Sequence, residues 1–208
     1  MTSDENRKKI VETAVEMFSD RGIRGVTMDD IAAAMHISKR TLYETFANKE
    51  ELLAECLMFV HDAIRQRHKQ VYEKVDEPFL VALFMLRVNA MSSHSYRRLI
   101  EEAKRYYPEI HDRFFKLYTE SFRDILMKSM LYAAEKNYLR PHVDINTTVD
   151  FLCEMLQRHR LPQSSSPEEY YRKLNEIGFT FLRGLMSSDT IHRYEKREDE
   201  FHKIMNSQ

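Results

Sequence analysis

The stretch of sequence that decides the fold is residues 25–53, GVTMDDIAAAMHISKRTLYETFANKEELL. Thr27 is followed three residues later by Asp30, which is close to a capping box and predicts a short helix that runs to about Met35. Ser38 is the next N-cap candidate, because a serine hydroxyl can accept a hydrogen bond from a backbone N–H in the first turn of a helix. The stretch therefore predicts two short helices in close succession.

The second of these helices, at residues 39–46, follows a tight turn at residues 36–37. Two short helices joined by a tight turn have the spacing of a helix-turn-helix, whose second helix can enter the major groove of DNA. The internal core would be formed by Ile31, Ala32, Met35, Ile37, Leu42 and Phe46. The side chains left facing outward would be Lys39, Arg40, Thr41, Tyr43 and Thr45. Lys and Arg donate hydrogen bonds to phosphate or guanine, and Thr and Tyr hydroxyls bond phosphate oxygens.

The rest of the chain also has the periodicity of helices. Only 4 Gly and 5 Pro occur in 208 residues, too few for an architecture of strands and turns. Apolar positions recur at three- and four-residue steps, and we expect further helices at residues 4–20, 48–72, 79–91, 96–106, 108–136, 144–159, 168–186 and 191–204. The predicted fold class is all-α, with an N-terminal three-helix domain that contains the helix-turn-helix and a C-terminal helical bundle.

The composition is that of an ordinary soluble chain, with 43% hydrophobic and 31% charged residues and a formal net charge of -1. No uncharged stretch approaches the 18 or so apolar residues that a spanning helix needs, which excludes an integral membrane protein. The first residues are acidic where a secretory signal is basic, and Cys56 and Cys153 are too few for a disulfide framework. We therefore expect a cytoplasmic protein with both cysteines in its core.

Charge and catalytic motifs give little support to other functions. Residues 1–50 hold 8 basic and 9 acidic side chains, so this segment is not basic as a whole. The chain contains no C-x-x-C, G-x-G-x-x-G, P-loop, G-x-S-x-G or H-E-x-x-H motif. No Glu is followed three residues later by His, as a di-iron helical bundle requires. We predict no catalytic residue, no metal site and no cofactor.

The helix-turn-helix region resembles the signature of the TetR (tetracycline repressor) family of bacterial transcription regulators. The matching positions are Thr27, Asp30, Ile31, Ala32, Ile37, Ser38, Thr41, Leu42, Tyr43, Phe46, Asn48, Lys49, Glu50, Glu51 and Leu52. The resemblance implies a DNA-binding domain at residues 1–50 and a helical effector-binding and dimerisation domain at residues 51–208. It implies DNA contacts by Thr27, Ser38, Lys39, Arg40, Thr41, Tyr43, Thr45 and Lys49. Lys49, at the start of the long helix, is expected to contact phosphate.

Two positions depart from the family pattern. The turn glycine that is usual in the family is His36 here, which fits if the histidine adopts the left-handed conformation. The aromatic residue often found after the tyrosine is Glu44, which would either accept a hydrogen bond from cytosine or repel phosphate. The resemblance therefore does not predict the operator sequence.

In the C-terminal part the resemblance is architectural, and it implies a homodimer and an effector pocket. The implied dimer surface comprises Leu152, Met155, Leu156, Leu174, Ile177, Gly178, Phe181, Leu182 and Leu185, with a purely intramolecular core as the alternative. An apolar pocket would be lined by Phe84, Met91, Tyr96, Tyr107, Phe114, Tyr118 and Phe122. Such a stripe is more often core than pocket.

These observations predict a regulator of transcription. We expect a repressor that binds double-stranded palindromic operator DNA as a homodimer and is released when a small-molecule effector binds the C-terminal domain. The alternative is a DNA-bound adaptor whose C-terminal domain binds a protein partner. A ligand sensor should contain a cavity in each subunit, whereas an adaptor should show an exposed apolar patch beyond the dimer face.

Overall fold

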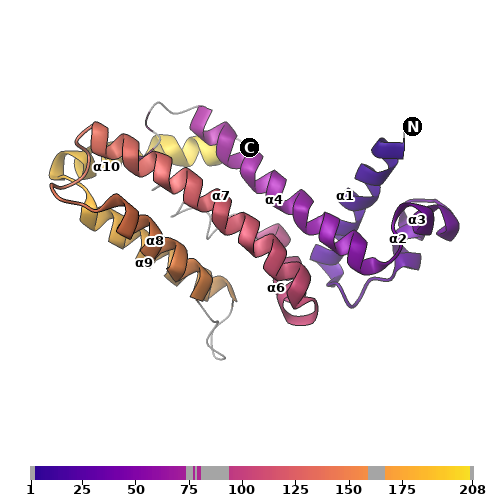
Figure 1. Cartoon of the computed structure of the whole chain (residues 1–208). Coiled ribbons are helices and arrows are strands. Elements are labelled where there is room, and N and C mark those ends of the chain that lie inside the picture. The colour runs from indigo at the N-terminus through magenta and orange to yellow at the C-terminus, as the bar shows by residue number, and fades with distance from the viewer. Residues whose placement is uncertain (1–2, 74–76, 78, 81–93, 159–166, 207–208) are drawn as a thin grey trace. The chain divides into compact units, whose positions relative to one another are not determined.

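The computed structural model describes residues 3–73, 77, 79–80, 94–158 and 167–206 (Figure 1). Within these ranges the chain forms helices α1 (Ser3–Arg21), α2 (Met28–Ala34), α3 (Lys39–Thr45), α4 (Lys49–Glu73), α6 (His94–Tyr106), α7 (Pro108–Glu135), α8 (Ile145–Arg158), α9 (Pro167–Leu185) and α10 (Ser188–Asn206). The protein is therefore all-α, as its sequence predicts.

Extended pairing in the described residues is confined to one bridge between Leu139 and Met186. None of the helices in these ranges is both long and apolar enough to cross a lipid bilayer. The expected helix at residues 79–91 lies largely outside the part of the chain that the structure describes.

The chain divides into two compact units, each of which is described by itself. The first consists of Met1–Arg65 and Ser93–Tyr118, and the second of Gln66–Ser92 and Thr119–Gln208. Helices α4 and α7 contribute residues to both units. The first unit contains α6 in addition to α1, α2 and α3, whereas the sequence places a domain boundary at residue 50. The two divisions differ because the boundary at residue 50 marks the end of the helix-turn-helix motif, whereas the two units are groups of residues that pack together.

Both short helices of the first unit begin at the predicted N-cap residues. The Thr27 hydroxyl accepts from the Asp30 N–H at 3.1 Å, and the Asp30 carboxylate accepts from the Thr27 N–H at 2.7 Å, which completes the capping box. Hydrogen bonds from the hydroxyl and the backbone N–H of Thr27 lower the pKa of Asp30. The Ser38 hydroxyl accepts from the Thr41 N–H at 3.0 Å. Helices α2 and α3 therefore start where the sequence predicts.

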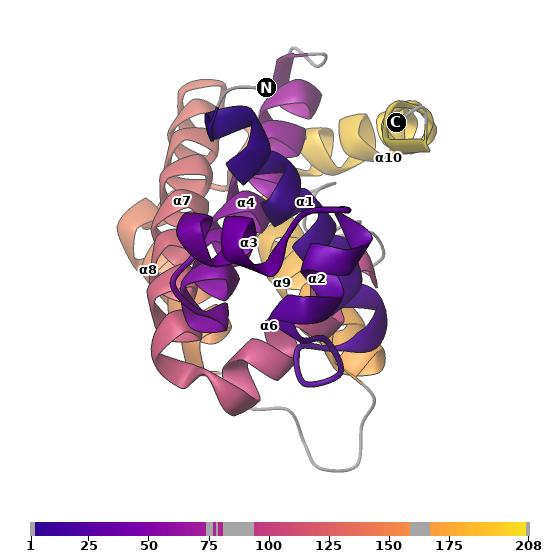
Figure 2. The same cartoon turned by 90° about the vertical axis from the view of Figure 1, so that its right-hand side faces the viewer.

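The turn between α2 and α3 is closed by His36 in the left-handed conformation, with φ of 53°. The His36 N–H donates to the Ala33 carbonyl at 3.1 Å, and the Ile37 N–H donates to the Ala32 carbonyl at 3.0 Å. These bonds satisfy carbonyls at the end of α2 that lack partners within the helix. The expectation for His36 is confirmed, and Figure 2 shows α3 following α2 across this turn.

The core of the first unit holds α3 in place. Leu42 and Phe46 are completely buried, and burial of such a side chain contributes about 1.5–3 kcal/mol. They pack in one cluster with residues of α1, α2 and α4, among them Ile10, Ala14, Phe18, Ile31, Ala32, Leu52, Leu53 and Cys56. A seven-residue helix is too short to be stable in water by itself, so this packing keeps α3 folded.

The second unit packs parts of α7, α8, α9 and α10 around its own core, which includes Leu126, Met130, Val149, Leu152, Phe179, Leu182 and Tyr194. Gly178 lies where α9 approaches α8, because a Cβ at this position would be 3.4 Å from the Met155 Cε. Gly184 faces open space within the single chain. Of these two helical glycines, only Gly178 therefore lies at a close contact between helices in the described residues.

The two cysteines are buried and free, as expected. Cys56 belongs to the core of the first unit and Cys153 to that of the second. Burial raises the pKa of both thiols. Since the thiolate is the reactive form of cysteine, both side chains are packing residues.

Candidate DNA-binding surface

Helix α3 presents three of the expected DNA-contacting side chains to solvent. The side chains of Lys39 and Arg40 are 67% and 87% exposed, and Tyr43 is 49% exposed. Leu42, on the opposite side of the helix, is completely buried. The exposed face thus combines two cations and a phenol hydroxyl, which are groups that bind phosphates and base edges.

Both cations of α3 are paired with carboxylates. The Lys39 ammonium donates to Asp29 of α2 at 2.5 Å, and this hydrogen bond raises the pKa of Lys39. The Arg40 guanidinium donates to Glu44 at 2.8 Å, across one turn of α3. Glu44 is the residue that departs from the family pattern, and here it offsets the charge of Arg40. The surface therefore carries basic groups with little excess positive charge.

Four of the five hydroxyl groups predicted to contact DNA take part in hydrogen bonds within the chain. The Thr27 hydroxyl donates to Asp30 at 2.6 Å, and the Thr45 hydroxyl donates to the Thr41 carbonyl at 2.9 Å. The hydroxyls of Ser38 and Thr41 are 2.8 Å apart and bond each other. A phosphate oxygen needs a donor, so Thr27 or Thr45 must rotate its hydroxyl to bond one. The DNA contacts of these four residues stay predictions.

The ammonium of Lys49, which is predicted to contact phosphate, already bonds backbone carbonyls of the same chain. Its ammonium donates to the carbonyls of Ile23 and Val26, both at 2.5 Å, in the loop between α1 and α2. It also lies 5.7 Å from the centre of the Phe18 ring. Partial burial lowers the pKa of Lys49. Because an ammonium has three donors, one is left for a phosphate, and that contact stays a prediction.

Sequence reasoning did not anticipate the contacts of Arg7, which lies outside residues 25–53, or of Asp29, which lies within them. Both side chains bond residues of α3. The Arg7 guanidinium lies 4.2 Å from the centre of the Phe46 ring and donates to the Thr45 carbonyl at 2.8 Å. It also forms ion pairs with Glu51 and Glu55, at 3.5 and 3.3 Å. Arg7 therefore links α1 to the end of α3 and to α4. No local pattern signals this contact, since it joins positions 38 residues apart.

The predicted pocket residues are distributed over both units. Tyr96 lines a cavity of about 370 Å³ together with Glu12, Val15, Glu16, Ser19 and Phe59. Three others pack in or against the core of the first unit, namely Tyr107, Phe114 and Tyr118. Phe122 packs against the core of the second unit. Phe84 and Met91 lie outside the described residues.

The predicted dimer residues include core and surface side chains. Leu152 and Leu182 are buried within the core of the second unit, so neither side chain is exposed on the surface of the single chain. Met155, Phe181 and Leu185 are partly buried against the same core. Gly178 is buried and Ile177 is 59% exposed. The side chains of Leu156 and Leu174 lie outside the description.

The N-terminal part of the chain matches a known family. Residues 10–56 match the bacterial regulatory proteins of the tetR family. The matched range contains α2, α3, most of α1 and the start of α4. It therefore includes the exposed face of α3 and the loop that Lys49 contacts.

Longer similarities extend beyond this region. The HTH-type transcriptional repressor KstR2 of Mycobacterium tuberculosis is 28% identical over 150 residues, which cover 70% of this chain and 75% of KstR2. A TetR-family transcriptional regulator from Cytophaga hutchinsonii matches with a TM-score of 0.67 and 16% identity, over 89% of this chain and 97% of that one. AibR in complex with isovaleryl coenzyme A and operator DNA matches with a TM-score of 0.50 and 20% identity, over 84% and 96%. At these identities the two structural matches establish the fold alone.

The pairing of Arg40 with Glu44 leads to a prediction for DNA binding. Glu44→Gln keeps the size of the side chain and removes its charge, which leaves Arg40 available to a phosphate. The slope of log affinity against log salt concentration should become steeper by about 0.9, the value of one added phosphate contact. Fluorescence anisotropy with a labelled duplex at several salt concentrations measures this slope.

Glu109→Gln is the matched control, because it makes the same charge change on α7, where Glu109 is exposed. This control should keep the wild-type slope. A wild-type slope in Glu44→Gln as well would mean that Glu44 does not restrain Arg40.

Proposed function

Because the chain belongs, through its N-terminal helices, to the TetR family of bacterial regulatory proteins, we propose that it is a cytoplasmic repressor that binds a palindromic operator as a homodimer. The observation that carries this proposal is the placement of α3. Leu42 fixes the helix by its burial, and Lys39 and Arg40 extend from its exposed face. A helix presented in this way fits the major groove, where base edges are distinguishable.

The ion pairs on α3 favour selective over indiscriminate binding. Non-specific affinity comes from uncompensated positive charge, and Asp29 and Glu44 offset the charges of Lys39 and Arg40. An exposed ion pair contributes about 0.2–1 kcal/mol, whereas a bidentate contact from arginine to the correct guanine is worth about 1–3 kcal/mol. A matching base can therefore displace Glu44 from Arg40, and a wrong base gains too little to do so.

The proposed dimer surface lies on α8 and α9. Phe151 and Ile177 are 50% and 59% exposed, and the Phe151 ring is 5.0 Å from that of Phe181. Ile177, Phe181 and Gly184 follow one another at four- and three-residue steps, so they share a face of α9. The open space at Gly184 would let a second helix approach closely. A seam of this kind suits a two-fold interface of four helices.

Release by a small molecule is supported by the cavity beside Tyr96. Its volume of about 370 Å³ lies within the range of roughly 300–1,000 Å³ that ligand pockets occupy. The solved complex of AibR contains both isovaleryl coenzyme A and operator DNA. In the alternative, a DNA-bound adaptor, a protein partner would cover apolar side chains outside α8 and α9, such as Leu131, which is 54% exposed on α7.

The DNA upstream of the protein's own gene is the first operator to test. Fluorescence anisotropy at two salt concentrations should show tight binding to this fragment that survives moderate salt. A scrambled fragment of the same length should bind at least about 10³-fold more weakly, because the affinity for a specific site typically exceeds the affinity for non-specific DNA by this factor or more. Equal, salt-sensitive binding to both fragments would contradict the assignment of this fragment as operator.

The dimer surface is tested by Ile177→Asp. A charge at the centre of an apolar interface should convert the dimer to a monomer in analytical ultracentrifugation, because the carboxylate would lose its hydration without a partner. Leu131→Asp is the matched control, because Leu131 is similar to Ile177 in size and in exposure. This control should sediment as the wild type does. If Ile177→Asp stays dimeric, the interface lies elsewhere on the chain.

A further inference from the structure

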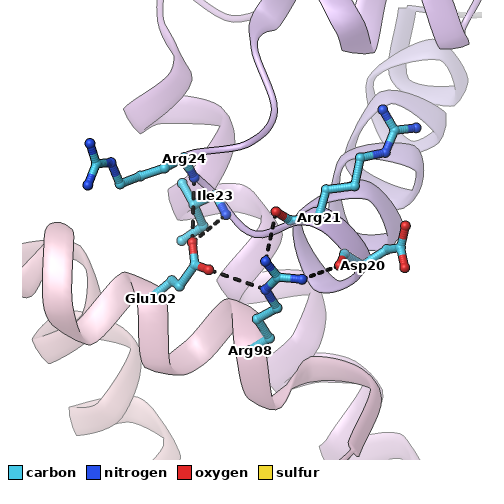
Figure 3. Close-up of polar contacts among 6 residues, drawn as sticks. All are labelled: Asp20, Arg21, Ile23, Arg24, Arg98 and Glu102. Atoms are coloured by element: carbon cyan, nitrogen blue, oxygen red, sulfur yellow. Dashed lines mark hydrogen bonds and ion pairs between the residues drawn. The ribbon is translucent and has the colours of Figure 1, made fainter.

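Charged side chains form hydrogen bonds with the backbone polar groups of the loop between α1 and α2. Helix α1 ends at Arg21, and Gly22 follows in the left-handed conformation, with φ of 82°. The Gly22 N–H donates back to the Phe18 carbonyl at 3.0 Å, which closes the helix. The chain then reverses, and the next amides along the loop lie opposite α6 (Figure 3).

Glu102 of α6 accepts hydrogen bonds from these amides. Its Oε2 lies 2.7 Å from the Ile23 N and 3.5 Å from the Arg24 N. The Glu102 side chain is only 23% exposed, so water replaces these bonds poorly. Consecutive backbone amides that converge on one carboxylate form an anion-binding concavity, and here a residue of the same chain occupies it.

Arg98, one turn before Glu102 on α6, holds the end of α1. Its guanidinium donates to the carbonyl of Asp20 and, at 2.9 Å, to that of Arg21 (Figure 3). These are the last carbonyls of α1 and lack partners within the helix, and a cation near them also suits the helix dipole. The Arg98 Nε further donates to the Glu102 Oε1 at 3.3 Å, so the two side chains support each other.

Gly22 makes room for this contact. A Cβ at this position would lie 2.3 Å from the Glu102 Oε1 and 2.8 Å from its Oε2. The carboxylate therefore occupies the space that any other side chain would fill. The glycine serves both the left-handed turn and the approach of α6.

Lys49 of α4 also holds this loop, because its ammonium donates to the carbonyls of Ile23 and Val26. Val26 directly precedes Thr27, the N-cap of α2. The loop amides are thus tied to α6 and the loop carbonyls to α4. These bonds therefore fix the point at which α2 begins. Because the tight turn joins α2 to α3, they also fix the position of α3.

We propose that Arg98 and Glu102 are positioning residues for DNA binding, which fix the loop at residues 22–26 and so hold α2 and α3 in the geometry that fits the operator. This inference rests on the proposed function. Neither residue needs to touch DNA. Loss of the Glu102 contact leaves two amides without their acceptor and lets the loop sample other conformations, so operator binding must restore the order.

The test uses the full-length protein and two measurements. In Glu102→Ala, amide hydrogen exchange should accelerate at Ile23 and Arg24, while the buried amides of α1 keep their protection. Affinity for the operator should fall about tenfold, the order of magnitude expected for a lost charge-assisted contact. Glu102→Gln, which keeps an acceptor oxygen and the side-chain shape, should lie between Glu102→Ala and the wild type.

Two controls match these variants. Glu109→Ala removes an exposed carboxylate from α7, to compare with Glu102→Ala. Arg105→Ala removes an exposed cation from α6 itself, to compare with Arg98→Ala, which should also weaken operator binding because the last carbonyls of α1 lose their donor. Both controls should exchange and bind as the wild type does. Melting temperatures of all variants separate a local effect from a general loss of stability.

A double-mutant cycle tests the contact itself. Gly22→Ala should weaken operator binding strongly when Glu102 is present, because the new methyl group displaces the carboxylate. In the Glu102→Ala background the same change should cost less, since only the backbone strain at Gly22 remains. Additive effects would mean that the two residues do not act through one another, and would overturn the proposal.

The outcomes also separate this proposal from the proposed function. Unchanged exchange at Ile23 and Arg24, or wild-type operator affinity in Glu102→Ala, overturns the positioning role while the function stands. If the wild-type protein prefers no operator, the proposed function fails, and with it the role of Arg98 and Glu102 in DNA binding. Faster exchange in Glu102→Ala would even then confirm that Glu102 holds the loop.

Discussion

The position of α3 depends on how the backbone of residues 22–26 is satisfied. This short loop contains amides and carbonyls that no helix can pair, and charged side chains of α4 and α6 bond them. Glycine at position 22 permits both the reversal of the chain and the approach of the Glu102 carboxylate. Helices α2 and α3 follow this loop directly in the chain, so the conformation of the loop determines where α2 begins and where the exposed face of α3 lies.

Charge on the exposed face of α3 is balanced locally, by Asp29 for Lys39 and by Glu44 for Arg40. The charges of the whole chain are balanced as well, with a formal net charge of -1. Asp29 and Glu44 reduce the positive charge that α3 offers to phosphates, so the proposed affinity depends more on contacts with base edges. Tyr96 lies two residues before Arg98 on α6 and lines the neighbouring cavity, so an occupant of that cavity would contact the helix that also holds the loop.

Much of the first unit is predictable because its signals are local. The capping of α2 by Thr27 and of α3 by Ser38, and the left-handed turn at His36, are decided by residues within four positions of one another. Arg98 and Glu102 escape prediction because their partners lie almost 80 residues away in the sequence. The dimer residues show the same limit: an apolar stripe marks a packed face, and only the fold shows that Leu152 and Leu182 pack inside while Ile177 is exposed.

In the proposed complex, two copies of α3 enter successive major grooves of one operator. Hydroxyl-radical footprinting of the full-length protein on the fragment that it binds shows which sugars the protein covers. We expect two related protected stretches on each strand, with half-site centres about 34–36 Å apart, one turn of the double helix. A single protected stretch, or protection spread evenly along the fragment, would contradict this proposal.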